Sequence, residues 1–117
     1  MRKVKFILML FLVLSCDDII EVEDISNKMV TILAPTDNIT LTITEVNFSW
    51  DMLDDAEQYK LQIATPTFEE ATQILLDTII TITNFNKTLD VGNYEWRIRA
   101  ENSEYQTSYT TQSFTIE

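Results

Sequence analysis

Four carboxylates crowd one short stretch of the sequence between two runs of apolar residues. They belong to Asp51, Asp54, Asp55 and Glu57. Calcium takes roughly six to eight oxygen ligands, so carboxylates at this density can form a Ca²⁺ site. The stretch lacks the Asp-x-Asp-x-Asp-Gly order of a calcium-binding loop, and a solvated turn between two strands explains the same composition. We therefore expect a turn first and a metal site second.

Aromatic side chains form the second candidate group, because a rigid exposed ring can stack on the face of a sugar. Phe68, Tyr105 and Tyr109 lie in or near expected loops and are the candidates for such stacking. Trp50 and Trp96 instead fall in phase with the apolar residues of their segments. This phase predicts that both tryptophans fill the core.

The single cysteine, Cys16, follows three basic residues and an unbroken apolar run over 6–14. That run is shorter than the roughly 20 residues of a transmembrane helix, and it fits a cleaved secretory signal. The motif Val13-Leu14-Ser15-Cys16 resembles the lipobox of bacterial lipoproteins, in which the cysteine is acylated and the chain is cut just before it. The resemblance implies that residues 1–15 are a signal peptide. It also implies that the lipid on Cys16 attaches the chain to a membrane.

The charge of the chain excludes several classes of function. Cleavage before Cys16 removes three of the eight basic residues and none of the 19 acidic ones, which leaves a formal net charge of −14. A chain of this charge repels nucleic acids and anionic lipid surfaces, so we expect no nucleic-acid partner. The sequence has no histidine, which removes Ser-His-Asp and Cys-His catalysis. Carboxylates confined to one loop rarely flank a glycosidic bond, so we expect no enzyme and no cofactor.

Two short motifs resemble signals of one Gram-negative phylum. Asp17 and Asp18, just after the cysteine, resemble a signal for display on the outer cell surface. The implied location is the cell envelope, as an outer-membrane lipoprotein exposed on the surface. Asp77-Thr78-Ile79 resembles the O-glycosylation motif of the same phylum, with Thr78 as the acceptor.

Residues 16–28 are acidic and lack Gly and Pro, which predicts a solvated tether before the folded domain. From residue 29 onward, apolar and polar residues alternate with the period of a β-strand. We expect strands over 29–33, 39–50, 59–64, 73–83, 85–89, 94–100 and 108–116. A phase slip at Glu45 requires a bulge or a turn. Residues 68–72 are long enough for only one helical turn. This pattern predicts an all-β, two-sheet antiparallel sandwich over 29–117.

Four landmarks of the pattern resemble the fibronectin type III family of immunoglobulin-like sandwiches. They are Val46-Asn47-Phe48-Ser49-Trp50, Tyr59-Lys60-Leu61-Gln62-Ile63, Leu89-Asp90-Val91-Gly92-Asn93-Tyr94 and Tyr94-Glu95-Trp96-Arg97-Ile98-Arg99-Ala100-Glu101-Asn102. The third landmark resembles the family's tyrosine corner, in which a tyrosine hydroxyl bonds to nearby backbone. We expect Gly92 to supply a positive φ in the turn there. The resemblance is weakest over 84–88, where polar residues fall at expected core positions.

The two resemblances together imply a non-catalytic, lipid-anchored surface module that acts as a spacer or a protein-interaction domain. Similar lipoproteins accompany polysaccharide-uptake systems, and their first sandwich after the anchor usually serves as a spacer. The alternative is a carbohydrate-binding lipoprotein of such a system, with glycan on Phe68, Tyr105 and Tyr109. A Ca²⁺-dependent adhesin ranks third. The expected partners are the membrane, through the lipid on Cys16, and an envelope protein or a glycan. Arg97 and Arg99 share the outward face of their strand with Glu95, and we expect them to form cross-strand pairs with acidic neighbours.

Overall fold

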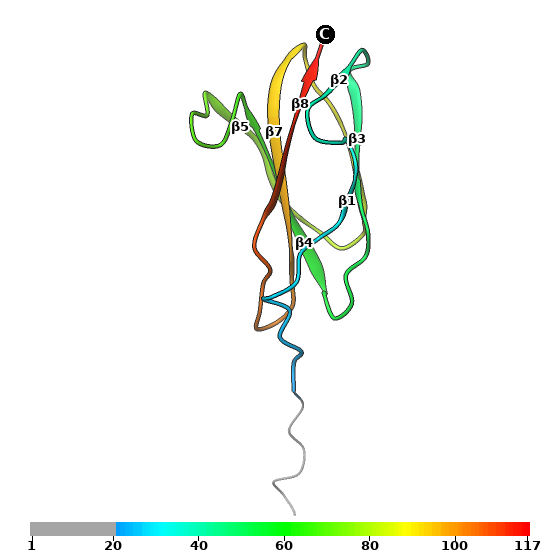
Figure 1. Cartoon of the computed structure of the whole chain (residues 1–117), viewed down its shortest axis with the longest axis vertical. Helices are drawn as coiled ribbons and strands as arrows, with labels where there is room; N and C mark the ends of the chain where they lie inside the picture. The colour runs from blue at the N-terminus through cyan, green and yellow to red at the C-terminus, as the bar shows by residue number, and fades with distance from the viewer. Residues whose placement is uncertain (1–20) are drawn as a thin grey trace, which may run out of the picture.

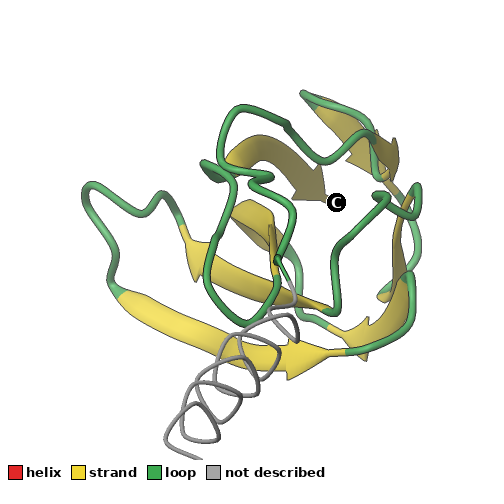
Figure 2. Ribbon diagram, turned by 90° about the horizontal axis from the view of Figure 1, so that it is seen from below, coloured by secondary structure: helices red, strands yellow, loops and turns green. Residues whose placement is uncertain are grey.

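The computed structural model describes residues 21–117, in which eight strands form two facing sheets (Figures 1 and 2). The strands are β1 (Ile32–Ala34), β2 (Ile39–Leu41), β3 (Glu45–Trp50), β4 (Gln58–Thr65), β5 (Gln73–Ile80), β6 (Asn84–Thr88), β7 (Gly92–Glu101) and β8 (Thr110–Ile116). One sheet has the order β1-β3-β6 and the other β2-β8-β7-β4-β5. All neighbouring strands pair antiparallel except β2 and β8, which are parallel. The predicted all-β sandwich is therefore confirmed.

Several sequence predictions fall before the first described residue. The signal segment 1–15, Cys16 and the pair Asp17-Asp18 lie outside the described residues. No helix within residues 21–117 is long and apolar enough to cross a membrane.

The phase slip at Glu45 marks the point where the chain changes sheet. Before it, β2 pairs with β8 in the five-stranded sheet. After it, β3 pairs with β1 and β6 in the three-stranded sheet. Residues 42–44 form the crossover between the two sheets. The slip is thus a turn. Of the alternating apolar residues before it, Leu41 packs against the core, whereas Ile39 and Ile43 are exposed.

Aromatic rings from both sheets meet in the core. Trp50 of β3 and Trp96 of β7 have ring centroids 6.4 Å apart, and Phe48 packs edge-to-face on Trp96 at 4.9 Å. Edge-to-face packing brings the positive ring edge against the negative ring face, which is the favoured arrangement. The residues predicted to point inward are all at most 6% exposed: Trp50, Tyr59, Leu61, Tyr94, Trp96 and Ile98. The alternation therefore identified the core correctly.

The folded domain begins before the segment in which the sequence alternates as a strand. Ile25 is completely buried and belongs to the hydrophobic core. Close by, the side-chain amide of Asn102 donates a hydrogen bond to the carbonyl oxygen of Glu23 at 2.9 Å. The predicted tether over 16–28 is therefore too long, because its C-terminal part is packed against the domain. A single buried isoleucine in an acidic run has no period that could reveal it.

The left-handed backbone turns are made without glycine. Asn38 has a φ of 62° and Asp55 a φ of 69°, whereas Gly92 has no positive φ, so that expectation was wrong. Asn and Asp tolerate this conformation because their short polar side chains can bond locally. A Cβ at position 92 would lie 3.7 Å from the ring of Tyr94, which is ordinary van der Waals contact. Gly92 is therefore not required by backbone geometry.

The edge strand β6 keeps a regular register despite its polar residues. Phe85 lies opposite Phe48 and Lys87 lies opposite Val46. Residues directly opposite in an antiparallel pair share a face, so Phe85 and Lys87 point inward. Phe85 packs against the core, while Lys87 is half-buried. At a sheet edge the lysine stem can cover apolar surface while its ammonium group reaches water.

A candidate binding face on the five-stranded sheet

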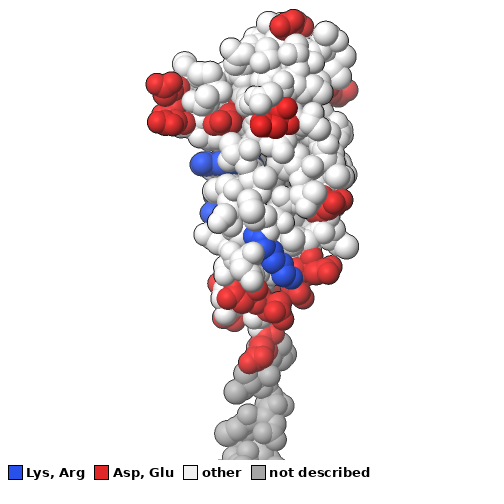
Figure 3. All heavy atoms as spheres, in the orientation of Figure 1, with Lys and Arg blue, Asp and Glu red and all other residues white. Residues whose placement is uncertain are grey.

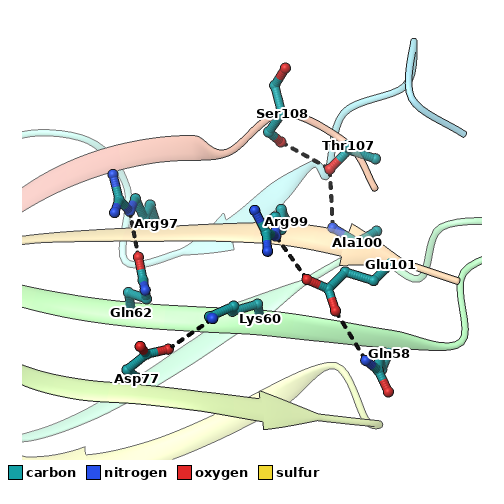
Figure 4. A network of polar contacts seen from close by, with 10 residues as sticks. All are labelled: Gln58, Lys60, Gln62, Asp77, Arg97, Arg99, Ala100, Glu101, Thr107 and Ser108. Atoms are coloured by element: carbon teal, nitrogen blue, oxygen red, sulfur yellow. Dashed lines mark hydrogen bonds and ion pairs between the residues drawn. The ribbon is translucent and has the colours of Figure 1, made fainter. Parts of the chain in front are cut away.

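The exposed side of the five-stranded sheet carries an ordered set of polar side chains (Figure 4). Alternate residues of β7 from Tyr94 to Ala100 are buried, so the residues between them project from the opposite side. β4 lies beside β7 and contributes a second polar row. We call this surface the outer face. It consists of Glu95, Arg97, Arg99 and Glu101 of β7, Gln58, Lys60 and Gln62 of β4, and the loop residues Phe68 and Tyr109.

At one end of the outer face, Glu101 is the centre of a small network. It accepts hydrogen bonds from Gln58 Nε2 at 3.0 Å and from Arg99 Nε at 2.8 Å. Burial alone would raise the pKa of Glu101. The two hydrogen bonds and the charges of Arg99 and Lys60 outweigh burial and hold the pKa of this carboxyl below its usual value. Lys60 also pairs with Asp77 of β5 at 3.5 Å. Arg99 and Lys60 therefore already have anionic partners.

Arg97 is held in a different way. Its guanidinium carbon lies 4.1 Å from the ring centroid of Phe68 and 4.4 Å from that of Tyr109. Its Nε donates a hydrogen bond to Gln62 Oε1 at 2.7 Å. Within residues 21–117 no carboxylate forms an ion pair with Arg97. The expected cross-strand pairing is therefore found for neither arginine among the described residues. Arg99 pairs with Glu101 of its own strand, and Arg97 has no carboxylate within ion-pair distance.

Phe68 reaches the outer face from the loop between β4 and β5. Its backbone N–H donates a hydrogen bond to the Glu95 carboxylate at 2.8 Å. The hydroxyl of Thr67 accepts a hydrogen bond from the N–H of Glu70 at 3.1 Å, which shapes the loop. Residues 68–72 form a turn and a bend here, so the helical turn that their length allowed is not formed.

Tyr109 is positioned by the buried residue Thr107, which is 3% exposed. The Thr107 hydroxyl accepts from the N–H of Ala100 at 3.0 Å and donates to the carbonyl of Ser108 at 2.9 Å (Figure 4). These bonds fix the segment just before β8, so the Tyr109 ring lies beside β7. The ring also contacts Arg99, whose guanidinium carbon is 4.8 Å from its centroid.

Two of the three predicted stacking aromatics thus meet on the outer face, and the third does not. Tyr105 is half-buried against the core. It lines a separate cleft with the acidic N-terminal residues Glu21, Glu23 and Asp24. The three rings therefore do not form one site.

The remaining predicted site residues are dispersed. Within residues 21–117 no three acidic, histidine or cysteine side chains come together in a way that could hold a metal ion. Asp55 instead pairs with Lys28 at 3.9 Å. The geometry thus gives no support to a Ca²⁺ site built from Asp51, Asp54, Asp55 and Glu57. Thr78 of β5 lies opposite the buried Leu61 and is half-buried on the inner side of the sheet.

Charge is distributed unevenly over the surface. Acidic side chains gather at the end where the N-terminal segment enters and at the opposite end (Figure 3). The described chain contains five basic residues, and three of them, Lys60, Arg97 and Arg99, lie on the outer face. The outer face is therefore the region where a strongly acidic protein presents positive charge.

Sequence reasoning identified the candidate rings but not their relation to Arg97. The alternation of the sequence does place Arg97 and Arg99 on the outward side of their strand. Which loops fold back over that side depends on tertiary structure. The contacts of Phe68 and Tyr109 with Arg97 join residues 29 and 12 positions apart in the chain, and no local pattern encodes them.

Comparison with known proteins agrees with the sandwich. No protein-family model matches the chain, and no curated protein matches it in sequence. Fibronectin type III-like modules of Clostridium thermocellum CbhA align with a TM-score of 0.55 at 10% identity, over 76% of this chain and 96% of theirs. A fibronectin type III domain derived from the human KIAA0970 protein aligns with a TM-score of 0.51 at 10% identity, over 75% of this chain and 70% of its own. The chain therefore has the fibronectin type III-like fold.

Proposed function

We propose that this chain is a non-catalytic, lipid-anchored module of the cell envelope that acts as a spacer or a protein-interaction domain. The observation that carries the proposal is the position of the two ends of the described chain. The N-terminal segment enters at one pole of the sandwich and the C-terminus lies at the opposite pole (Figure 1). A module of this geometry places the length of its strands between the anchor and the far pole.

The position of Ile25 sets how far the sandwich can stand from the membrane. Eight residues, 17–24, separate Cys16 from this buried residue. Even fully extended they span at most about 30 Å. We infer that the domain stays close to the bilayer, while its acidic end prevents adsorption to anionic lipids.

Fatty-acid labelling tests the anchor. Cells expressing the full chain are fed labelled palmitate and then fractionated. The wild type should be labelled and sediment with membranes, because stable attachment needs more than one acyl chain and diacylation supplies it. Cys16→Ala should be unlabelled. An unlabelled wild-type protein in the soluble fraction would show that the anchor proposal is wrong.

The double variant Asp17→Asn/Asp18→Asn is the matched control for labelling and tests the location separately. It keeps Cys16 and should therefore take up palmitate like the wild type. Surface display predicts that protease added to intact cells digests the wild type but spares this variant. Wild-type protein that resists external protease, in cells shown to carry the lipid, would contradict surface exposure and leave the anchor intact.

A second candidate function is carbohydrate binding as part of a polysaccharide-uptake system. The specific observation in its favour is that Phe68 and Tyr109 come together on the outer face around Arg97. Affinity electrophoresis of the full chain on polysaccharide gels tests it, with Phe68→Ala and Tyr109→Ala as the disabling variants. Tyr105→Ala is the control, because Tyr105 lies in a different part of the molecule. Equal retardation of all three variants and the wild type would contradict this role for the outer face.

A further inference from the structure

We propose that the outer face binds polysaccharides that carry carboxylates, that is uronate polymers, with Arg97 as the anchoring cation. The proposal rests on the second candidate function and adds the chemical class of the glycan. It begins from the contrast between Arg97 and the two other basic residues of this face. Lys60 and Arg99 have carboxylate partners at 3.5 and 2.8 Å, whereas Arg97 has none among the described residues.

The Arg97 side chain is already ordered for binding. Phe68 and Tyr109 contact its guanidinium group, and Gln62 accepts a hydrogen bond from its Nε. Immobilising a long side chain normally costs conformational entropy on association. Because Arg97 is already ordered in the free protein, its binding to a ligand loses less of that entropy. Within residues 21–117 the terminal nitrogens of Arg97 have no hydrogen-bond acceptor. A planar guanidinium with free terminal N–H groups matches a carboxylate, which it can bind through two parallel hydrogen bonds.

The topology favours a ligand that binds to side chains over a peptide that pairs with the sheet as an extra strand. In the order β2-β8-β7-β4-β5, both β7 and β4 have a neighbour on each side. Their backbone groups are therefore used within the sheet, and an acidic peptide cannot extend the sheet at Arg97. The rest of the outer face suits sugar hydroxyls, because the amides of Gln58 and Gln62 and the exposed hydroxyl of Thr111, opposite Arg97, offer neutral donors and acceptors.

The charge of the protein further restricts the class of ligand that can bind. The chain after Ser15 carries a net charge of −14, so an anionic polymer is repelled by most of the surface and attracted only where positive charge is left over. An anionic bilayer has the same sign over a wide area and would face the whole acidic end of the domain. A single polymer strand can lie along the outer face and avoid the acidic ends. The two carboxylates of that face have partners of their own, because Glu101 pairs with Arg99 and Glu95 accepts a hydrogen bond from the Phe68 N–H.

The test compares one polymer with and without its carboxylates. The full chain, in a non-ionic detergent, is run on affinity gels that contain polygalacturonate, alginate or fully methyl-esterified polygalacturonate. Polygalacturonate or alginate should retard the wild type, and the methyl ester should not. Arg97→Gln should weaken binding about tenfold or more, the loss expected for a charge-assisted hydrogen bond. Arg97→Lys keeps the charge but not the planar fork, and it should also lose most of the affinity.

Lys28→Gln is the matched control, since it removes the same charge from a side chain that lies off the outer face. It should bind like the wild type, and thermal unfolding of each variant verifies that the fold is intact. Three results overturn the proposal: retardation by neither uronate polymer, equal retardation by the methyl ester, and wild-type binding by Arg97→Gln. Binding of polyglutamate as strong as binding of the uronate polymers also overturns it, because the site would then recognise negative charge and not the sugar. Binding of neutral polysaccharide that needs Phe68 and Tyr109 but not Arg97 rejects uronate recognition and preserves the second candidate function.

Discussion

The hydroxyl of Tyr94 donates a hydrogen bond of 2.6 Å to the carbonyl oxygen of Asp90, four residues earlier. The Tyr94 ring is 6% exposed and stacks on Phe114 with centroids 5.3 Å apart. One side chain thus joins the turn before β7 to the core, as the tyrosine-corner resemblance implied. Burial, followed by the negative charge of Asp90, raises the pKa of Tyr94 above its ordinary value of 10.0. The phenol is protonated at neutral pH, as any tyrosine is, and the shift keeps it a donor further into the alkaline range.

Tyr94→Phe tests this relationship by removing only the hydroxyl. We expect the free energy of unfolding to fall by about 1–2 kcal/mol, because the Asp90 carbonyl loses its partner while the ring packing is kept. Urea unfolding measures the change. Gly92→Ala is the control and should change stability by less than about 0.5 kcal/mol, since this position needs no positive φ. A larger loss from Gly92→Ala than from Tyr94→Phe would contradict our description of the corner.

Trp50→Ala tests the packing between the sheets. Trp50 is 1% exposed and meets Tyr59 edge-to-face at 5.7 Å. Truncating a buried tryptophan leaves a cavity, so unfolding should become easier by about 3–5 kcal/mol. Met52→Ala, at a side chain 75% exposed, should be nearly neutral by comparison. Indole fluorescence of the folded wild type that iodide quenches freely would show that the tryptophans are not in the core.

Period-two alternation explains why so much of the fold could be predicted. Each strand that is buried on one face repeats its apolar residues at every second position, so Trp50 and Trp96 were recognisable as core residues without structural information. The phase slip at Glu45 was readable as a bulge or a turn, but the alternation alone did not indicate that the chain changes sheet there. The register of β6 was harder to predict. An edge strand tolerates the inward-pointing Lys87, and this residue interrupts the apolar alternation.

The outer face could be predicted only in part, because its organisation comes from contacts between distant segments. Alternation places Arg97 on the outward side, but its contacts with Phe68 and Tyr109 depend on how two loops close over the sheet. Ile25 is another example of the same limit. Its burial depends on the pole of the sandwich against which the N-terminal segment packs, and an isolated apolar residue carries no periodic signal.

Ile25→Ala tests whether the N-terminal segment is part of the domain. The side chain is fully buried, so its truncation should reduce the free energy of unfolding by about 2–5 kcal/mol. Met29→Ala is the matched control, because Met29 is a nearby large apolar residue that is 57% exposed. Denaturant midpoints of the two variants give the comparison. Equal midpoints would mean that residues before 29 act as a tether and not as a part of the core.

The lowered pKa of Glu101 predicts that the free energy of unfolding depends on pH. Its pKa is lower in the folded protein than its ordinary value of 4.5, so the folded state binds this proton less tightly than the unfolded state does. The stabilisation is therefore present above the ordinary value and is lost as the pH falls through the lowered folded pKa. Its sources are the hydrogen bonds that the ionised carboxylate accepts from Gln58 and Arg99, together with the charges of Arg99 and Lys60. Removal of the carboxylate charge should therefore remove the dependence.

Glu101→Gln, studied by urea unfolding between about pH 7 and pH 3, measures this contribution. The variant should be less stable than the wild type near neutral pH, because Arg99 loses its carboxylate while Gln58 keeps an acceptor. The difference should shrink as the pH falls, since the wild-type carboxyl then becomes neutral as well. Glu104→Gln, at an exposed side chain, should follow the wild type throughout. A stability difference that stays constant across this range would mean that Glu101 acts through packing and not through its charge.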